Sequence, residues 1–238
     1  MSKEQFLRTE MLLGEAAMEK LAASHVAVFG LGGVGSWCVE ALARAGVGTL
    51  TLVDHDQVGL TNINRQIQAL HSTVGMDKTE AMAGRVRDIH PACRLRLLTA
   101  KYEAERREAF FDVSYDYIVD AIDLVSCKLD LIETALTREI PIISSMGTGN
   151  KLDSSLFRVS DISKTEGCAL ARILRKELKK RGIVHHKVVF SPELPAKAEQ
   201  KETPPPGRRT VPASAPWVPP AAGFLLAGEV IRDLIKQS

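Results

Sequence analysis

Short apolar runs and helical stretches alternate along the first two thirds of the chain. Each run is short enough for a buried strand, and apolar residues at helical spacing lie between the runs. Such alternation is typical of a parallel sheet covered by helices on both faces. We therefore predict an α/β fold with a doubly wound, mainly parallel sheet through about residue 146. The expected strands are residues 26–29, 50–53, 94–99, 117–123 and 140–145, and the expected helices follow residue 36 and span 78–89, 106–111 and 128–139.

The two ends of the chain follow other patterns. Residues 4–22 have roughly helical apolar spacing that Gly14 interrupts, which predicts a short arm and a helix over residues 1–24. Near the other end, no crossover pattern joins the apolar runs 157–159 and 188–190. These two runs are expected to form a C-terminal antiparallel extension of the sheet.

A proline-rich segment precedes the last helix. Residues 195–220 hold eight of the 11 prolines, which favours a flexible loop or a lid over regular structure. Residues 223–235 are amphipathic and predict a terminal helix packed on the sheet. At 238 residues the chain suits a single domain with a sizeable core.

A glycine turn follows the first expected strand. Gly30, Gly32 and Gly35 match the fingerprint of a nucleotide-binding turn, where missing side chains let backbone N–H groups approach a phosphate. Asp54 ends the next strand about 20 residues later, where a carboxylate can bind a ribose. The alternative, a tight turn that binds nothing, leaves Asp54 unexplained. The pattern predicts a Rossmann-like nucleotide-binding core but does not say which nucleotide it takes.

Composition narrows the class of protein. Apolar content of 45% and charged content of 25% are ordinary for a globular chain, and a net charge of +2 leaves nucleic-acid binding to local patches. No uncharged apolar run reaches the roughly 18 residues that a membrane span needs. The first 24 residues carry several charges, which excludes a signal-peptide core. We expect a cytoplasmic protein that does not contact membranes.

The cysteines carry little chemistry in this pattern. Cys38, Cys93, Cys127 and Cys168 are scattered and form no Cys-x-x-Cys pair. This spacing argues against a structural zinc site and against a disulfide framework. We expect free thiols, and we assign no catalytic role to Cys168.

Charged residues beyond the turn favour a triphosphate over a nicotinamide cofactor. Arg65 and Lys78 can neutralise phosphates, and Asp123, at the end of a strand, can hold a magnesium ion. Alternatively, Arg65 and Lys78 are solvated surface charges, Asn62 only caps a turn, and Asp120 is a strand-end hydrogen-bond acceptor. The candidate set is Gly30, Gly32, Gly33, Gly35, Ser36, Asp54, Asp56, Asn62, Asn64, Arg65, Gln66, Lys78 and Asp123.

This set resembles the adenylating enzymes of the ubiquitin-activating type over about residues 8–150. In that family ATP lies on the glycine turn, and a substrate carboxylate attacks its α-phosphate with loss of pyrophosphate. The resemblance implies that Asp54 binds the ribose, that Arg65 and Lys78 hold phosphates and act in catalysis, and that Asp123 serves Mg²⁺. It also implies a homodimer in which Arg8 reaches the partner's site, although Arg8 is equally explained as an ordinary exposed charge.

Within the family, the sequence of this chain is most similar to the branch of tRNA threonylcarbamoyladenosine dehydratases. Similar stretches are residues 8–10, 30–37, 61–67, 120–123 and 160–165. This branch activates the carboxylate of a modified adenosine so that the same side chain closes into a ring. Ring closure needs no enzyme nucleophile and no zinc, which agrees with the cysteine spacing.

Three other functions remain as alternatives. The first is adenylation of the C-terminus of a ubiquitin-like sulfur-carrier protein, the second a non-catalytic nucleotide sensor, and the third a nicotinamide oxidoreductase. A sulfur-transfer partner is conceivable from the family, but no residue argues for one. On the dehydratase reading, residues 25–155 form the ATP-binding core and residues 156–238 the substrate-binding and dimer-supporting part.

A cationic helix suggests where a large anionic substrate would bind. Residues 172–187 contain seven lysines and arginines against Glu177 alone, a local charge of +6 without the histidines. Such a patch can contact tRNA phosphates, although a solvated helix face is the alternative. Trp217 can stack on a base or anchor the proline-rich segment.

Overall fold

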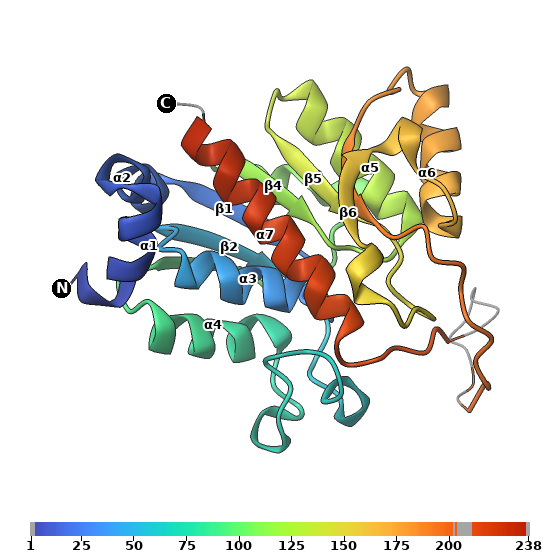
Figure 1. Ribbon diagram of the computed structural model, residues 1–238, viewed down its shortest axis with the longest axis horizontal. Coiled ribbons are helices and arrows are strands. Elements are labelled where there is room, and N and C mark those ends of the chain that lie inside the picture. Colours follow the sequence, from blue (N-terminus) through green and yellow to red (C-terminus); the bar gives the residue numbers. More distant parts are fainter. Residues whose placement is uncertain (1–2, 202, 204–210, 237–238) are drawn as a thin grey trace.

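A seven-stranded sheet forms the centre of the computed structural model, which describes residues 3–201, 203 and 211–236 (Figure 1). The strand order is β3-β2-β1-β4-β5-β7-β6. All neighbouring strands pair in parallel except β6 and β7, which are antiparallel. The strands are β1 (His25–Phe29), β2 (Thr49–Val53), β3 (Arg94–Leu98), β4 (Tyr117–Asp120), β5 (Ile142–Ser145), β6 (Arg158–Asp161) and β7 (Lys187–Phe190).

Helices cover both faces of the sheet, so the core has two halves. One half lies beneath α3, α4 and α7, and the other beneath α5, α6 and the 3-10 turn η4. The helices are α1 (Leu7–Leu13), α2 (Glu15–Ala23), α3 (Gly35–Arg44), α4 (Lys78–Ile89), α5 (Val125–Thr137), α6 (Ala169–Lys180) and α7 (Val218–Lys236). The 3-10 turns are η1 (Lys3–Phe6), η2 (Leu60–Asn62), η3 (His71–Thr73), η4 (Ala104–Phe110), η5 (Ser154–Leu156) and η6 (Ile162–Lys164).

The chain reverses its direction of winding between β1 and β4. From β1 it runs outward through β2 to β3, then returns to place β4 on the other side of β1. Open α/β sheets bind ligands at such a switch point, outside the carboxyl ends of the strands. The glycine turn after β1 and the residues after β4 both lie there.

The predicted fold class is confirmed, including the antiparallel extension. Helix α4 has the bounds predicted for it. Residues 4–22 form two helices instead of one, because Gly14 has a φ of +86° that ends α1 and starts α2. The predicted helix over 106–111 is the 3-10 turn η4.

Helix α7 begins five residues earlier than the predicted start at 223. Its first turn contains Pro219 and Pro220, where a missing N–H leaves no hydrogen bond unmade. Part of the predicted flexible loop, residues 202 and 204–210, lies outside the described residues. Among the described residues, no helix is long and apolar enough to cross a membrane.

Candidate functional site

The glycine turn is shaped by contacts that only glycine allows. Gly30 has a φ of +90° and donates its N–H to the Val53 carbonyl at 2.8 Å. A Cβ on Gly30 would lie 2.7 Å from the Ala121 carbonyl oxygen. A Cβ on Gly35 would lie 1.8 Å from the Gly30 carbonyl oxygen. The first and last glycines of the turn therefore fold the chain tightly at the start of α3.

The middle of the turn is open. A Cβ on Gly32 would meet no heavy atom within 4 Å, so this position leaves room for a ligand. Gly33 is enclosed between the Pro219 ring and the side-chain stem of Arg65, at 3.0 Å and 3.3 Å from an added Cβ. Ser36 is fully buried, and its Oγ has no hydrogen-bond partner among the described residues. Together the residues 30–36 form an open cradle at the N-terminus of α3, which suits a phosphate.

Asp54 ties the end of β2 to this cradle. Its Oδ2 accepts the Leu31 N–H at 2.6 Å, and its Oδ1 accepts the Asp56 N–H at 2.9 Å. The side chain is buried. A carboxylate oxygen can accept two hydrogen bonds, and each Asp54 oxygen accepts one from the backbone. Asp54 therefore keeps acceptor capacity for a ribose hydroxyl.

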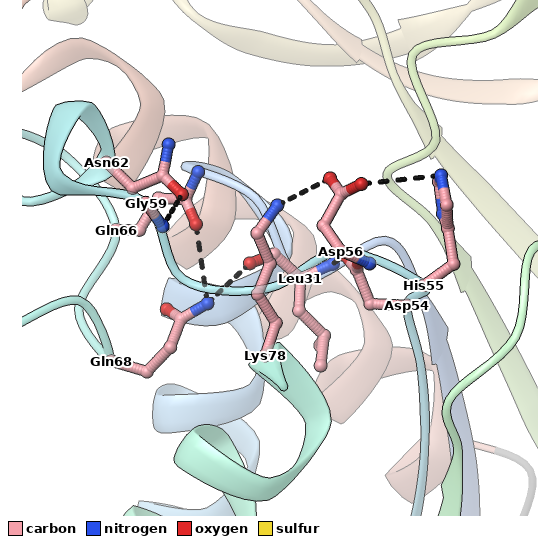
Figure 2. Close-up of polar contacts among 9 residues, drawn as sticks. All are labelled: Leu31, Asp54, His55, Asp56, Gly59, Asn62, Gln66, Gln68 and Lys78. Atoms are coloured by element: carbon pink, nitrogen blue, oxygen red, sulfur yellow. Dashed lines mark hydrogen bonds and ion pairs between the residues drawn. The ribbon is translucent and has the colours of Figure 1, made fainter. Parts of the chain in front are cut away.

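Lys78 points from the first residue of α4 toward Asp56 (Figure 2). Its Nζ lies 2.7 Å from Asp56 Oδ2, and its backbone N–H donates to the Asp56 carbonyl at 3.0 Å. Lys78 is buried, whereas about half of the Asp56 side chain is exposed. The ammonium is therefore held beside the cradle by one carboxylate that faces solvent.

A cluster that the sequence analysis missed lies in the same place. Ligand atoms of Asp54, His55 and Asp56 lie within 4.8 Å of one another, close enough for a metal ion. Because Asp54 accepts two backbone N–H groups and Asp56 pairs with Lys78, these carboxylates already have partners.

Arg65 lies along the other side of the cradle. Its stem packs against Gly33, and its Nη1 donates to the Thr61 carbonyl at 2.9 Å and to Asn64 Oδ1 at 2.7 Å. Asn64 also donates to the Ser214 carbonyl at 3.0 Å, which fastens this loop to the proline-rich segment. The guanidinium is thus anchored next to the turn.

Asn62 and Gln66 serve the local structure. Asn62 Oδ1 accepts the Gly59 N–H at 3.0 Å, so Asn62 caps a turn, and its role in nucleotide binding stays a prediction. Gln66 is buried, and Gln68, which the sequence analysis missed, donates to the Leu31 carbonyl at 2.7 Å (Figure 2). Gln68 Oε1 is buried without a partner among the described residues.

Asp123 is exposed at the carboxyl end of β4, three residues beyond the strand. The nearby residue Ala121 touches the glycine turn, which brings Asp123 to the same edge as the cradle. Its negative charge raises the pKa of Lys128, a residue of α5.

A buried polar network lies at the carboxyl end of β4, beneath the turn that leads to Asp123. Lys128 Nζ lies 2.7 Å from Asp120 Oδ2, Ser144 Oγ donates to the same oxygen at 2.6 Å, and His186 Nε2 lies 2.8 Å from Ser144 Oγ. Burial lowers the pKa of Lys128, against the raising effect of Asp120. Burial and the charge of Lys128 lower the pKa of His186 to about 3. The alternative that Asp120 is a strand-end acceptor is confirmed, and Lys128, Ser144 and His186 are residues that the sequence analysis missed.

Arg8 lies away from this site within the chain. It is exposed on α1, two residues after Phe6, whose ring packs against the His90 ring with centroids 5.0 Å apart. His90 precedes β3, so α1 lies by the amino ends of the strands, opposite the cradle (Figure 1). One chain therefore brings together the cradle, Asp54, Asp56, Arg65, Lys78 and Asp123, but not Arg8.

The chain is similar to known proteins along almost its whole length. It is 43% identical to the tRNA threonylcarbamoyladenosine dehydratase of Bacillus subtilis over 241 residues, which covers 98% of this chain and 95% of that protein. The crystal structure of the Escherichia coli tRNA N6-threonylcarbamoyladenosine dehydratase, TcdA, in complex with ATP superposes with a TM-score of 0.89. That match has 35% identity and covers 99% of this chain and 95% of that one. The same enzyme in complex with AMP gives a TM-score of 0.90 at 34% identity, with the same coverage.

The resemblance to the adenylating enzymes is thereby confirmed. Residues 6–236 match the ThiF family, which leaves only the ends of the chain outside the match. The chain belongs to the ThiF family, and within it to the group that contains the tRNA threonylcarbamoyladenosine dehydratases.

Proposed function

We propose that this protein is an ATP-dependent dehydratase that acts on threonylcarbamoyladenosine in tRNA. The observation that carries this proposal is the meeting of an open glycine cradle, a buried carboxylate and two anchored cations at the switch point of the sheet. A site of this kind suits a nucleotide whose phosphates carry several negative charges. Similarity to dehydratase relatives over nearly the full chain supports the choice of substrate.

The residue roles follow from the geometry around the cradle. The open position at Gly32 receives the ATP phosphates, and Asp54 accepts a ribose hydroxyl. Lys78 and Arg65 neutralise charge on the phosphates, since each holds its cation beside the turn. Lys78 leaves Asp56 for a phosphate oxygen at little cost, because Asp56 is half exposed and can be solvated.

Asp123 is the residue that we assign to magnesium. Mg²⁺ takes one or two protein carboxylates and completes its shell with phosphate oxygens and water. An exposed carboxylate next to the glycine turn fits that donor set. When bound, the ion supplies positive charge to the pyrophosphate that leaves.

The chemistry then needs only ATP and the substrate's own atoms. A carboxylate oxygen of the threonyl group attacks the α-phosphorus, the bond to the β-phosphate breaks, and pyrophosphate leaves. An atom of the same side chain next attacks the activated carbonyl carbon and loses a proton. AMP leaves with the former carboxylate oxygen, so the nucleoside has lost one water. Cys38, Cys93, Cys127 and Cys168 are buried, which agrees with a reaction that uses no enzyme thiol.

The exposed face of α6 is the surface that we assign to tRNA phosphates. Arg172, Lys176 and Lys179 point outward at helical spacing on one side of this helix. Arg175 instead donates to Thr165. Lys180 and Arg181 pair with Glu177 and Glu133, respectively. We therefore place the phosphate contacts on the first three residues and not on the whole charged run.

A second copy of the chain completes the site in this proposal. Arg8 lies on the edge opposite its own cradle, so it can reach a cradle only in another subunit. On this reading, residues 25–155 bind ATP, and residues 156–238 support substrate binding and the dimer.

The fate of the carboxylate oxygen tests the proposed reaction. Modified tRNA whose threonyl carboxylate carries heavy oxygen is incubated with ATP and the protein, and AMP is analysed by mass spectrometry. We expect one labelled oxygen in AMP for each nucleoside that loses water. ADP with labelled inorganic phosphate would mean that the carboxylate is activated at the γ-phosphate of ATP, contrary to the proposal.

A further inference from the structure

Trp217 lies two residues before a proline that borders the proposed ATP site. It immediately precedes α7, and Pro219, two residues later, lies 3.0 Å from a Cβ placed on Gly33. The segment before it crosses the carboxyl edge of the sheet. Ser214 accepts a hydrogen bond from Asn64, and the Ala213 N–H donates to Asn150 Oδ1 at 2.8 Å. Residues 211–217 thus join the loop after β2 to the loop after β5.

The indole ring is held in place yet remains open to solvent. Its Nε1–H donates to the Leu152 carbonyl at 2.8 Å, which satisfies the only polar atom of the ring system. Trp217 is nevertheless 54% exposed, and Leu152 beside it is 60% exposed. A side chain that served only as a packing anchor would be buried, since burial of its apolar surface is what anchors it.

The surroundings of Trp217 suit an anionic chain with flat bases. The Ala196 N–H donates to the Asn150 carbonyl at 2.7 Å, and the following residue, Lys197, is exposed. Arg65 lies on the other side of the segment, against Gly33. Single-stranded RNA is recognised by aromatic rings that stack on unpaired bases, with cations nearby for the backbone.

We propose that Trp217 is a stacking platform for an unpaired base that neighbours the modified adenosine of the RNA. This inference rests on the proposed function, because that function brings the adenosine side chain to the α-phosphate at the cradle. A base next to it in the strand then lies over residues 211–217. The platform holds the strand while the carboxylate enters the site.

Three variants separate stacking from other roles. Trp217→Ala removes the ring, Trp217→Phe keeps an aromatic face, and Phe224→Leu changes a half-exposed aromatic side chain elsewhere on α7 as a control. The probes are modified tRNA and an unmodified RNA stem–loop with unpaired bases in its loop. We measure KM for tRNA, KM for ATP, the oligomeric state and the quenching of tryptophan fluorescence by the stem–loop. The chain has two tryptophans, so Trp217→Phe identifies the signal of Trp217.

We expect Trp217→Ala to raise KM for tRNA about tenfold or more, as loss of one stacked base does, with KM for ATP within about twofold of wild type. Trp217→Phe should recover most of the loss, and the stem–loop should quench wild-type fluorescence but not that of Trp217→Phe. RNA binding that is equal in wild type and Trp217→Ala overturns the platform and leaves the dehydratase function standing. A Trp217→Ala protein that changes its oligomeric state shows a subunit contact instead. Absence of RNA binding in the wild type defeats the proposed function itself.

Discussion

Lys128 Nζ lies 2.7 Å from Asp120 Oδ2, and neither side chain exposes any surface. Asp120 ends β4 and its Oδ1 accepts the Ile122 N–H at 3.1 Å, so the pair shapes the turn that leads to Asp123. Ala121, in the same turn, touches Gly30 and Gly35. A buried ion pair therefore supports both the glycine cradle and the proposed metal ligand.

Breaking this pair should be costly because it leaves a charge buried without a partner. We expect Lys128→Met to lower the free energy of unfolding by about 3–5 kcal/mol in urea titrations. Adding Asp120→Asn to that variant should restore part of the loss, since the buried negative charge is then gone. Lys101→Met, at an exposed lysine, serves as the control and should leave stability unchanged. A Lys128→Met protein as stable as wild type would show that the pair carries no such role.

His186 should make the fold sensitive to acid. Burial and the charge of Lys128 lower the pKa of its imidazole from 6.5 to about 3. Between these values the unfolded chain binds a proton that the folded chain does not, so stability is full above pH 6.5 and falls as the pH drops toward 3. At about pH 5 the expected loss is about 2 kcal/mol.

The comparison variant for this effect is His186→Gln, which removes the titrating group. Urea unfolding at about pH 7.5 and about pH 5 should show a smaller loss for the variant than for wild type, by about 2 kcal/mol. All groups other than residue 186 are the same in both proteins, so their contributions cancel in the comparison. Equal losses in the two proteins would mean that His186 is not the source of the acid sensitivity.

Substitutions at two glycines of the cradle should have different effects, one on stability and the other on ATP affinity. Gly35→Ala places a Cβ 1.8 Å from a carbonyl oxygen, so we expect a loss of stability of at least about 1–3 kcal/mol. Gly32→Ala meets no protein atom within 4 Å, so the fold should persist while the Cβ takes phosphate space. Calorimetric titration should therefore show weaker ATP binding by stably folded Gly32→Ala.

Gly84→Ala is the matched control for these two variants. Gly84 lies within α4, and an added Cβ meets nothing within 4 Å. Alanine is the better helix former, so this change should stabilise the protein by about 0.5–1 kcal/mol and leave ATP affinity unaltered. Unchanged ATP affinity in Gly32→Ala would place the phosphates elsewhere.

The exposed cations of α6 should make the affinity for tRNA depend on salt concentration. We expect the triple variant Arg172→Gln, Lys176→Gln, Lys179→Gln to raise KM for tRNA while KM for ATP stays the same. The slope of log affinity against log salt should become shallower by about one for each phosphate that the variant no longer neutralises. Arg87→Gln, at an exposed cation of α4, should change neither quantity. A triple variant with the salt dependence of wild type would leave α6 as a solvated face.

Much of the fold was predictable because it depends on local pattern. Short apolar runs indicated the strands, and Lys78–Ile89 became a helix with the predicted bounds because its apolar spacing ends before Pro91. The glycine turn was predictable for the same reason, since the tight approach of Gly35 to Gly30 joins residues that are close in the sequence.

Long-range pairing was not predictable in the same way. In the sequence, Lys128 looks like an ordinary charged residue of a helix. Only the fold brings it into contact with Asp120 and near His186. The start of α7 was missed because Pro219 and Pro220 usually indicate a loop, yet a first helical turn accepts them. Gln68 carried no signal at all, since its hydrogen bond to Leu31 joins residues of two separate loops.

The mass of the nucleoside tests the central claim most directly. Wild-type protein and Lys78→Ala, which loses the cation paired with Asp56, are incubated with ATP, magnesium and tRNA that carries threonylcarbamoyladenosine. Arg87→Ala, an exposed cation farther along the same helix, is the control. We predict a nucleoside lighter by one water, with one AMP and one pyrophosphate formed per product, for wild type and Arg87→Ala but not for Lys78→Ala. A nucleoside of unchanged mass, from folded wild-type protein that binds ATP, would contradict the dehydratase function.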